Sequence, residues 1–96
     1  MRPSLALQMK RGLVLEAARR FRMANPRVFG SVLHGSDHEG SDLDLLVDAP
    51  PGTTLFDLGG LQETLEALLG VRVELLTPAD LPLRYRDKVL AEARPL

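Results

Sequence analysis

The sequence predicts an α/β (α+β) protein in which helices flank a small mixed β-sheet. Two observations predict this class. Apolar residues recur at the three- and four-residue spacing of amphipathic helices in three long segments. Between those segments lie short apolar or alternating runs of the kind that forms strands. With a short helical turn after Gly30-Ser31 added to these segments, the resulting order is helix, strand, helix, strand, helix, strand and helix, which is typical of helices packed on a sheet.

Composition limits what the chain can be. Its 96 residues, 45% hydrophobic and 26% charged, can bury one modest core, so we expect a single domain over residues 1–96. The absence of cysteine excludes disulfides and cysteine-ligated zinc. No apolar run approaches the roughly 20 residues that span a bilayer, and no secretory signal opens the chain. We therefore expect a cytoplasmic protein without a membrane partner.

The first predicted helix covers about residues 4–24. Asn25-Pro26 should end it, because the residue before a proline is pushed out of the helical region. Apolar residues recur along it at every fourth position, and two more widen the stripe. We expect this stripe to be core and not a binding surface; it comprises Leu5, Met9, Leu13, Val14, Ala17, Ala18 and Phe21.

Three strands are predicted, at residues 27–29, 42–47 and 71–76. A helix over about residues 57–69 lies between the last two, with Gly70 as its stop. Gly59-Gly60 weakens its first turn, so its start is the least defined boundary.

The closing helix should cover residues 83–93. Thr77-Pro78-Ala79-Asp80 is a helix-start signal that precedes it. The periodicity predicts four inward positions, Tyr85, Val89, Leu90 and Ala93.

Residues 28–48 contain candidate metal-binding and phosphate-binding residues. Asp42 and Asp44 are two apart in a strand, so their side chains project from the same face. Neighbouring carboxylates repel each other unless a cation joins them, and Mg²⁺ prefers carboxylate and phosphate oxygen. Gly30-Ser31 follows a short apolar strand, where a glycine lets the backbone approach a ligand and the next N–H groups can meet a phosphate. Together these features favour a nucleoside triphosphate site.

A third acid belongs to this site if the strands are neighbours. In residues 71–76 the apolar side chains share one face, and Arg72 and Glu74 share the other. Glu74 can then reach a metal together with Asp42 and Asp44. The alternative is an exposed Glu74 paired with Arg72 or a lysine.

The pattern resembles the nucleotidyltransferase superfamily with the polymerase β-like fold, and its spacing resembles the minimal nucleotidyltransferase (MNT) group. The residues that carry the resemblance are Gly30-Ser31, Gly35, Ser41-Asp42 and Asp44-Leu45-Leu46-Val47. His34 stands where the group usually has arginine. The resemblance implies catalytic, metal-binding roles for Asp42, Asp44 and Glu74 with two Mg²⁺ ions, and nucleotide binding by Gly30, Ser31 and Ser41.

The same resemblance implies a function. MNT chains commonly accompany HEPN-domain toxins, and the activity expected is transfer of AMP from ATP to a hydroxyl, such as a tyrosine, of that partner. The chain ends soon after the predicted sheet, so we expect the acceptor to be presented from outside. Two alternatives stay open: an inactive nucleotide- or protein-binding antitoxin, and an oligomeric small-molecule nucleotidyltransferase.

Charge is distributed unevenly although the net charge is only −1. Seven of the twelve basic residues precede the candidate site, and five acids crowd into residues 37–48. A solvated helix face explains the basic end, and a surface for an acidic partner is the alternative. Direct nucleic-acid binding is not expected, and a homo-oligomer is compatible with the sequence. A zinc site at His34 and His38 is disfavoured, because their spacing fits no strong zinc pattern.

Overall fold

The computed structural model describes all residues 1–96. The chain alternates helices and strands as the sequence predicts, with one short 3₁₀ turn and a final two-residue strand. The elements are α1 (Pro3–Arg20), β1 (Ala24–Phe29), α2 (Gly30–His34), β2 (Leu43–Asp48), α3 (Leu55–Leu69), β3 (Val73–Leu76), η1 (Pro78–Asp80), α4 (Leu83–Glu92) and β4 (Arg94–Pro95).

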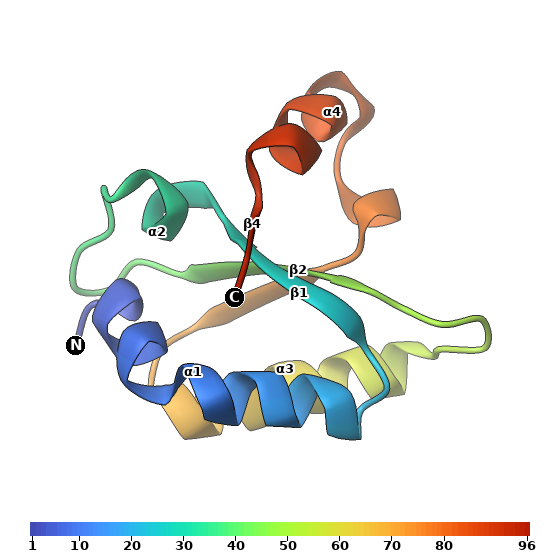
Figure 1. Cartoon of the computed structure of the whole chain (residues 1–96), viewed down its shortest axis with the longest axis horizontal. Helices are drawn as coiled ribbons and strands as arrows, with labels where there is room; N and C mark the ends of the chain where they lie inside the picture. The colour runs from blue at the N-terminus through green and yellow to red at the C-terminus, as the bar shows by residue number, and fades with distance from the viewer.

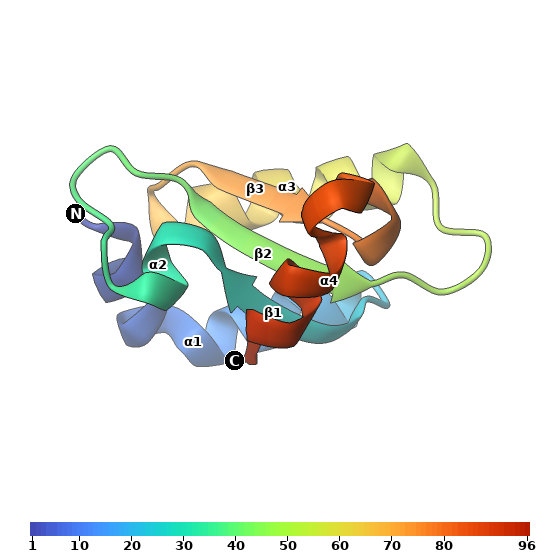
Figure 2. The same ribbon diagram turned by 90° about the horizontal axis from the view of Figure 1, so that it is seen from above.

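The four strands form one mixed sheet in the order β3-β2-β1-β4. β1 is antiparallel to both β2 and β4, whereas β2 and β3 run parallel. Figures 1 and 2 show α1 and α3 side by side on one face of this sheet and α4 on the other. The predicted fold class, a small mixed sheet flanked by helices, is confirmed. No helix of the structure is both long and apolar enough to cross a membrane.

The main core lies between the sheet and the α1–α3 layer. Alternate residues of β2, namely Leu43, Leu45 and Val47, are almost fully buried there. Leu61 and Leu65 of α3 meet them from the helix layer. Because side chains alternate along a strand, Asp44, Leu46 and Asp48 must project from the opposite face, towards α4.

The predicted stripe on α1 is wrong in its first half. Leu5, Met9 and Leu13 are 41%, 64% and 46% exposed. A strict four-residue spacing advances about 40° around the helix at each step, so Leu5 and Phe21 cannot share one face. The helix also breaks at Lys10, where φ is −126° and ψ is 24°. The residues that α1 buries follow the 3.6-residue period instead: Pro3, Ala6, Leu7, Val14, Ala17 and Ala18.

The end of α1 and the start of β1 also differ from prediction. The helix stops at Arg20, before the Asn25-Pro26 pair that should have ended it. Arg22 and Asn25 have positive φ, 63° and 51°, which turns the chain into the sheet. β1 therefore begins at Ala24 and contains an irregularity between Ala24 and Arg27.

α3 starts earlier than predicted because a capping box precedes the glycine pair. Thr54 accepts a hydrogen bond from the Asp57 N–H, and the Asp57 carboxylate accepts one from the Thr54 N–H. Gly60 lies against Phe21, the residue that follows the end of α1. A Cβ added at residue 60 would come 2.9 Å from Cε1 of Phe21. Gly70 ends the helix in the left-handed conformation, as predicted.

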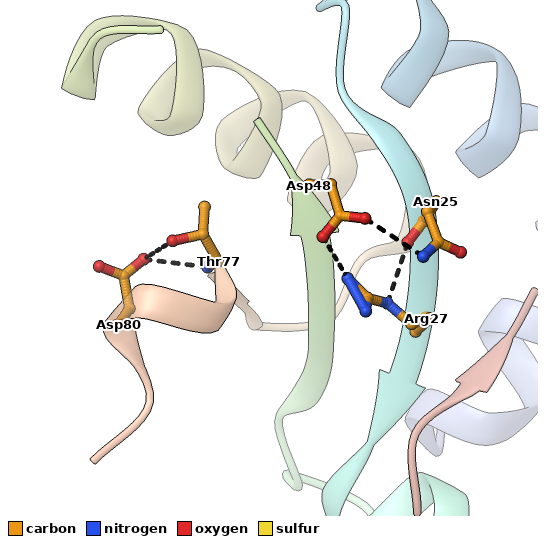
Figure 3. Close-up of polar contacts among 5 residues, drawn as sticks. All are labelled: Asn25, Arg27, Asp48, Thr77 and Asp80. Carbon is orange, nitrogen blue, oxygen red and sulfur yellow. Dashed lines mark hydrogen bonds and ion pairs between the residues drawn. The ribbon is translucent and has the colours of Figure 1, made fainter. Parts of the chain in front are cut away.

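The closing helix is placed correctly along the chain but not in the core. α4 has no buried residue, and Tyr85, predicted to point inward, is 43% exposed. The Thr77–Asp80 signal forms a capping box, drawn in Figure 3, but it starts only the 3₁₀ turn η1. The buried residue of this segment is Leu81, which follows η1. β4, which pairs with β1, was not predicted.

Candidate active site

The three predicted carboxylates lie together on the α4 side of the sheet. Asp44 on β2 and Glu74 on β3 are direct partners in the parallel register, so their side chains leave the same face at neighbouring positions. Asp42 is two residues before Asp44 and just precedes β2. The alternation argument thus predicted the neighbourhood of Asp44 and Glu74 correctly.

Asp44 is a carboxyl whose pKa is shifted by its surroundings. Partial burial raises its pKa to about 6, and the negative charges of Glu74 and Asp42 add to the shift. A cation at this point would relieve that repulsion, and carboxylate oxygens suit a hard divalent ion. No three acidic or imidazole side chains converge closely enough to enclose a cation, so the carboxylates do not form a complete metal site by themselves. Their chemistry fits Mg²⁺.

Gly30 brings the turn after β1 into contact with Asp44. A Cβ built on Gly30 would overlap Oδ2 of Asp44 and lie 3.0 Å from its Cγ. Its φ of 71° also favours glycine. Ser31 follows on α2, half-buried, and its carbonyl accepts the Ser36 N–H at 2.9 Å. Gly30 is thus adjacent to Asp44, and the nucleotide-binding roles of Gly30 and Ser31 stay predictions.

Ser41 is the predicted nucleotide ligand whose hydroxyl already has a partner. Its Oγ accepts the His38 N–H at 2.9 Å, and its own N–H donates to the His38 carbonyl at 3.0 Å. These bonds close the loop that leads into Asp42. The assignment of Ser41 to the nucleotide stays a prediction.

Sequence reasoning missed Asp37, which anchors that same loop. Its carboxylate is 6% exposed and accepts the Ser4 N–H at 2.9 Å, at the start of α1. This hydrogen bond holds the pKa of Asp37 below its usual value. Glu39 also meets the N-terminal ammonium at 2.8 Å. The partner of Asp37 is 33 residues away, so no local pattern could reveal it.

Most cations near the carboxylates have partners. Arg72 Nε lies 3.5 Å from Asp42 Oδ1, so Arg72 pairs with that acid and not with Glu74. Arg27 lies further along the same face of the sheet, and Figure 3 shows it between Asp48 and Asn25. Its Nη2 is 2.6 Å from Asp48 Oδ1, and its Nε donates to the Asn25 carbonyl at 3.1 Å. Arg27 thereby stabilises the end of the β1–β2 pair.

A cleft of about 350 Å³ opens beside Gly30, between α2 and α4. His34 of α2 and Glu92 of α4 pair across it, with Nε2 3.2 Å from Oε2. His38 does not line the cleft and instead places Nδ1 2.7 Å from the Glu39 carbonyl, within the loop. The cleft itself was not predicted. Its walls are Phe29, Gly30, His34, Tyr85, Lys88, Val89 and Glu92.

Comparison with known proteins agrees with this fold and site. Residues 11–96 match the family model of the nucleotidyltransferase domain. The chain is 40% identical, over 77 residues, to protein adenylyltransferase MntA of Thermococcus cleftensis, covering 80% of this chain and 78% of that protein. The chain belongs to the nucleotidyltransferase domain family.

Comparison with solved structures shows which type of nucleotidyltransferase this chain is similar to. A structure assigned as a minimal nucleotidyltransferase superposes with a TM-score of 0.86 at 45% identity, covering 98% of this chain and 96% of that one. A toxin–antitoxin structure with AMP-PNP gives a TM-score of 0.75 at 20% identity, covering 88% of this chain and 69% of that one. The second likeness concerns the fold alone. The first shows that this chain is of the minimal nucleotidyltransferase type.

Proposed function

We propose that this protein is the antitoxin of a toxin–antitoxin pair and acts by transferring AMP from ATP to a hydroxyl, such as a tyrosine, of a HEPN-type partner. The observation that carries the proposal is the set of three carboxylates, Asp42, Asp44 and Glu74, on the face that Gly30 touches. Similarity to a protein adenylyltransferase supports the choice of reaction. A similar fold in a toxin–antitoxin structure with AMP-PNP supports the choice of partner and nucleotide.

The reaction needs an acceptor oxygen in line with the α-phosphorus of ATP. The new bond joins that oxygen to the α-phosphorus, the bond to the β-phosphate oxygen breaks, and pyrophosphate leaves. Asp42 and Asp44 would hold Mg²⁺, with Glu74 as the third ligand. Two bound Mg²⁺ ions would polarise the acceptor hydroxyl and neutralise the charge on the phosphates. Gly30 and Ser31 would seat the phosphates, and Glu74 would receive the acceptor proton.

Intact-mass spectrometry tests the proposal. The purified protein is mixed with the proposed HEPN-type partner, ATP and Mg²⁺, and the mass of the partner is measured. We expect a gain of one AMP that disappears with the Asp42→Asn/Asp44→Asn double variant. Asp87→Asn is the matched control, because this acid is exposed on α4 and has no ion pair. No gain with the wild-type protein under saturating ATP would refute transfer.

One observation favours a second candidate, a binding-only antitoxin. Asp42, a proposed metal ligand, is paired with Arg72. A tight complex that silences the partner without any mass gain would support this reading over AMP transfer.

A further inference from the structure

The cleft between α2 and α4 has no role in the function proposed so far. It shares Gly30 with the carboxylate site, because Gly30 lines the cleft and also touches Asp44. The cleft and the carboxylate site are therefore adjacent at residue 30. The lining residues of the cleft belong to β1, α2 and α4, and α4 lies on the face of the sheet from which Asp44 projects.

The basic side chains around this face differ in whether they are free. Arg72 pairs with Asp42 at 3.5 Å, and His34 pairs with Glu92 at 3.2 Å. Arg86 donates to the carbonyls of Ala79 and Leu81 at 2.7–3.1 Å. These contacts fix the position of each of these basic side chains within the fold.

Two further cations lie on this side of α4 or at the sheet end. Arg84 stacks on Tyr85, with its guanidinium carbon 6.0 Å from the ring centroid. Arg27 is held by Asp48 at 2.6 Å. Lys88 differs from all of them, because it lines the cleft and makes no ion pair or hydrogen bond.

We infer that Lys88 binds the phosphate tail of the nucleotide and that the α2–α4 cleft is where this tail lies. The inference rests on the proposed function, since it assumes a nucleoside triphosphate at the carboxylates. Asp44 and Glu74 repel a polyphosphate unless cations offset their charge. Lys88 offers an ammonium with three donors in the lining of the cleft, which shares Gly30 with the carboxylate site.

Glu92 does not oppose this arrangement, because it is engaged across the cleft. Glu92 lies one turn after Lys88 on α4, yet its carboxylate pairs with His34 of α2 and not with Lys88. This contact links α4, which has no buried residue, to α2. Because Glu92 has this partner, Lys88 remains free for an anion.

Binding of three ligands separates this role from a general charge effect. We expect Lys88→Met to weaken Mg-ATP and inorganic tripolyphosphate about tenfold in calorimetry, since a charge-assisted contact to phosphate is lost. AMP, which lacks the β- and γ-phosphates, should bind as before. Lys88→Arg should retain ATP binding. Arg11→Met, the same charge change on exposed α1 across the sheet, should leave all three affinities unchanged.

The outcomes also separate this inference from the proposed function. Unchanged ATP affinity in Lys88→Met, or an equal loss for AMP, would overturn the role of Lys88 even if the wild-type protein transfers AMP. A wild-type protein that binds ATP through Lys88 but modifies no partner would overturn the proposed transfer and leave the inference standing. A wild-type protein that binds neither ATP nor tripolyphosphate would overturn both.

Discussion

Gly30 and Asp44 approach each other so closely that residue 30 has no room for a side chain. A Cβ there would overlap Oδ2 of Asp44, and the φ of 71° lies in the left-handed region. Both constraints apply at the residue that joins β1 to α2. The distance between the turn and the carboxylates therefore depends on glycine at this position.

Comparing Gly30→Ala with Gly35→Ala isolates that contact. Both glycines have a φ of 71°, but a Cβ on Gly35 would meet nothing within 4 Å. Gly35→Ala should cost roughly 1–2 kcal/mol of unfolding free energy from backbone strain alone. Gly30→Ala should lower the free energy of unfolding by more than this. It should also displace Asp44 and thereby lower the rate of AMP transfer on the order of 100-fold. Urea unfolding and the mass assay measure both effects. Equal behaviour of the two variants would contradict a role for the contact.

Alternation was the most reliable signal in the sequence. It predicted that Asp44 and Glu74 share a face, because side chains on neighbouring strands stay in register when their apolar partners are buried. The predicted apolar stripe on α1 was wrong in its first half because a four-residue repeat drifts around a helix. The break at Lys10 cannot be predicted from residue types. Long-range contacts, such as Asp37 with Ser4 and α4 beside α2, have no local pattern that predicts them.

The raised pKa of Asp44 predicts that Asp44→Asn stabilises the fold by an amount that depends on pH. The folded pKa of about 6 exceeds the ordinary value of 3.8, so the folded state binds the proton more tightly than the unfolded state. The wild-type protein therefore loses stability as pH rises from about 4 to about 6, whereas the amide variant does not. Above that range Asp44→Asn should be more stable by about 1 kcal/mol, because solvent screens this half-buried group.

Thermal unfolding from pH 4 to pH 8 measures this difference. The stability gain of Asp44→Asn should be absent near pH 4 and reach its plateau above pH 6. Mg²⁺ at pH 7.5 should stabilise the wild-type protein more than the variant, since a bound cation removes the same repulsion. Asp87→Asn, on exposed α4, should show neither effect. A gain that does not depend on pH would exclude the ionisation of Asp44 as its cause.

Asp37 should matter both to stability and to the active-site loop. Asp37→Ala removes the carboxylate that accepts the Ser4 N–H at the start of α1, which should cost about 1 kcal/mol, as for lost helix caps. Because the pKa of Asp37 is lowered in the folded state, its contribution is present above about pH 4 and lost below its folded pKa. Glu39→Ala, which removes the exposed pair with the terminal ammonium, should change stability much less. Denaturation at pH 7 compares the two variants, and equal losses would argue against the cap.

The exposed half of the α1 stripe suggests where the partner binds. Leu5, Met9 and Leu13 lie one turn apart and are largely uncovered, and the same helix carries Lys10 and Arg11. A second copy of this surface would bring like charges together, whereas an acidic partner with an apolar face would match it. Within the proposed function, that partner is the HEPN-type toxin.

Replacing Met9 by glutamate tests this surface against a matched charge. Met9→Glu puts a carboxylate into the stripe. Gln8→Glu puts the same charge on the preceding residue, which is also exposed but lies off the stripe. We expect Met9→Glu to weaken the complex with the toxin at least about tenfold, since an apolar contact is replaced by a desolvated charge. Gln8→Glu should weaken it much less, and Mg-ATP binding should be unchanged in both. Calorimetry with the purified toxin distinguishes the variants, and equal affinities would mean that the toxin binds elsewhere on the protein.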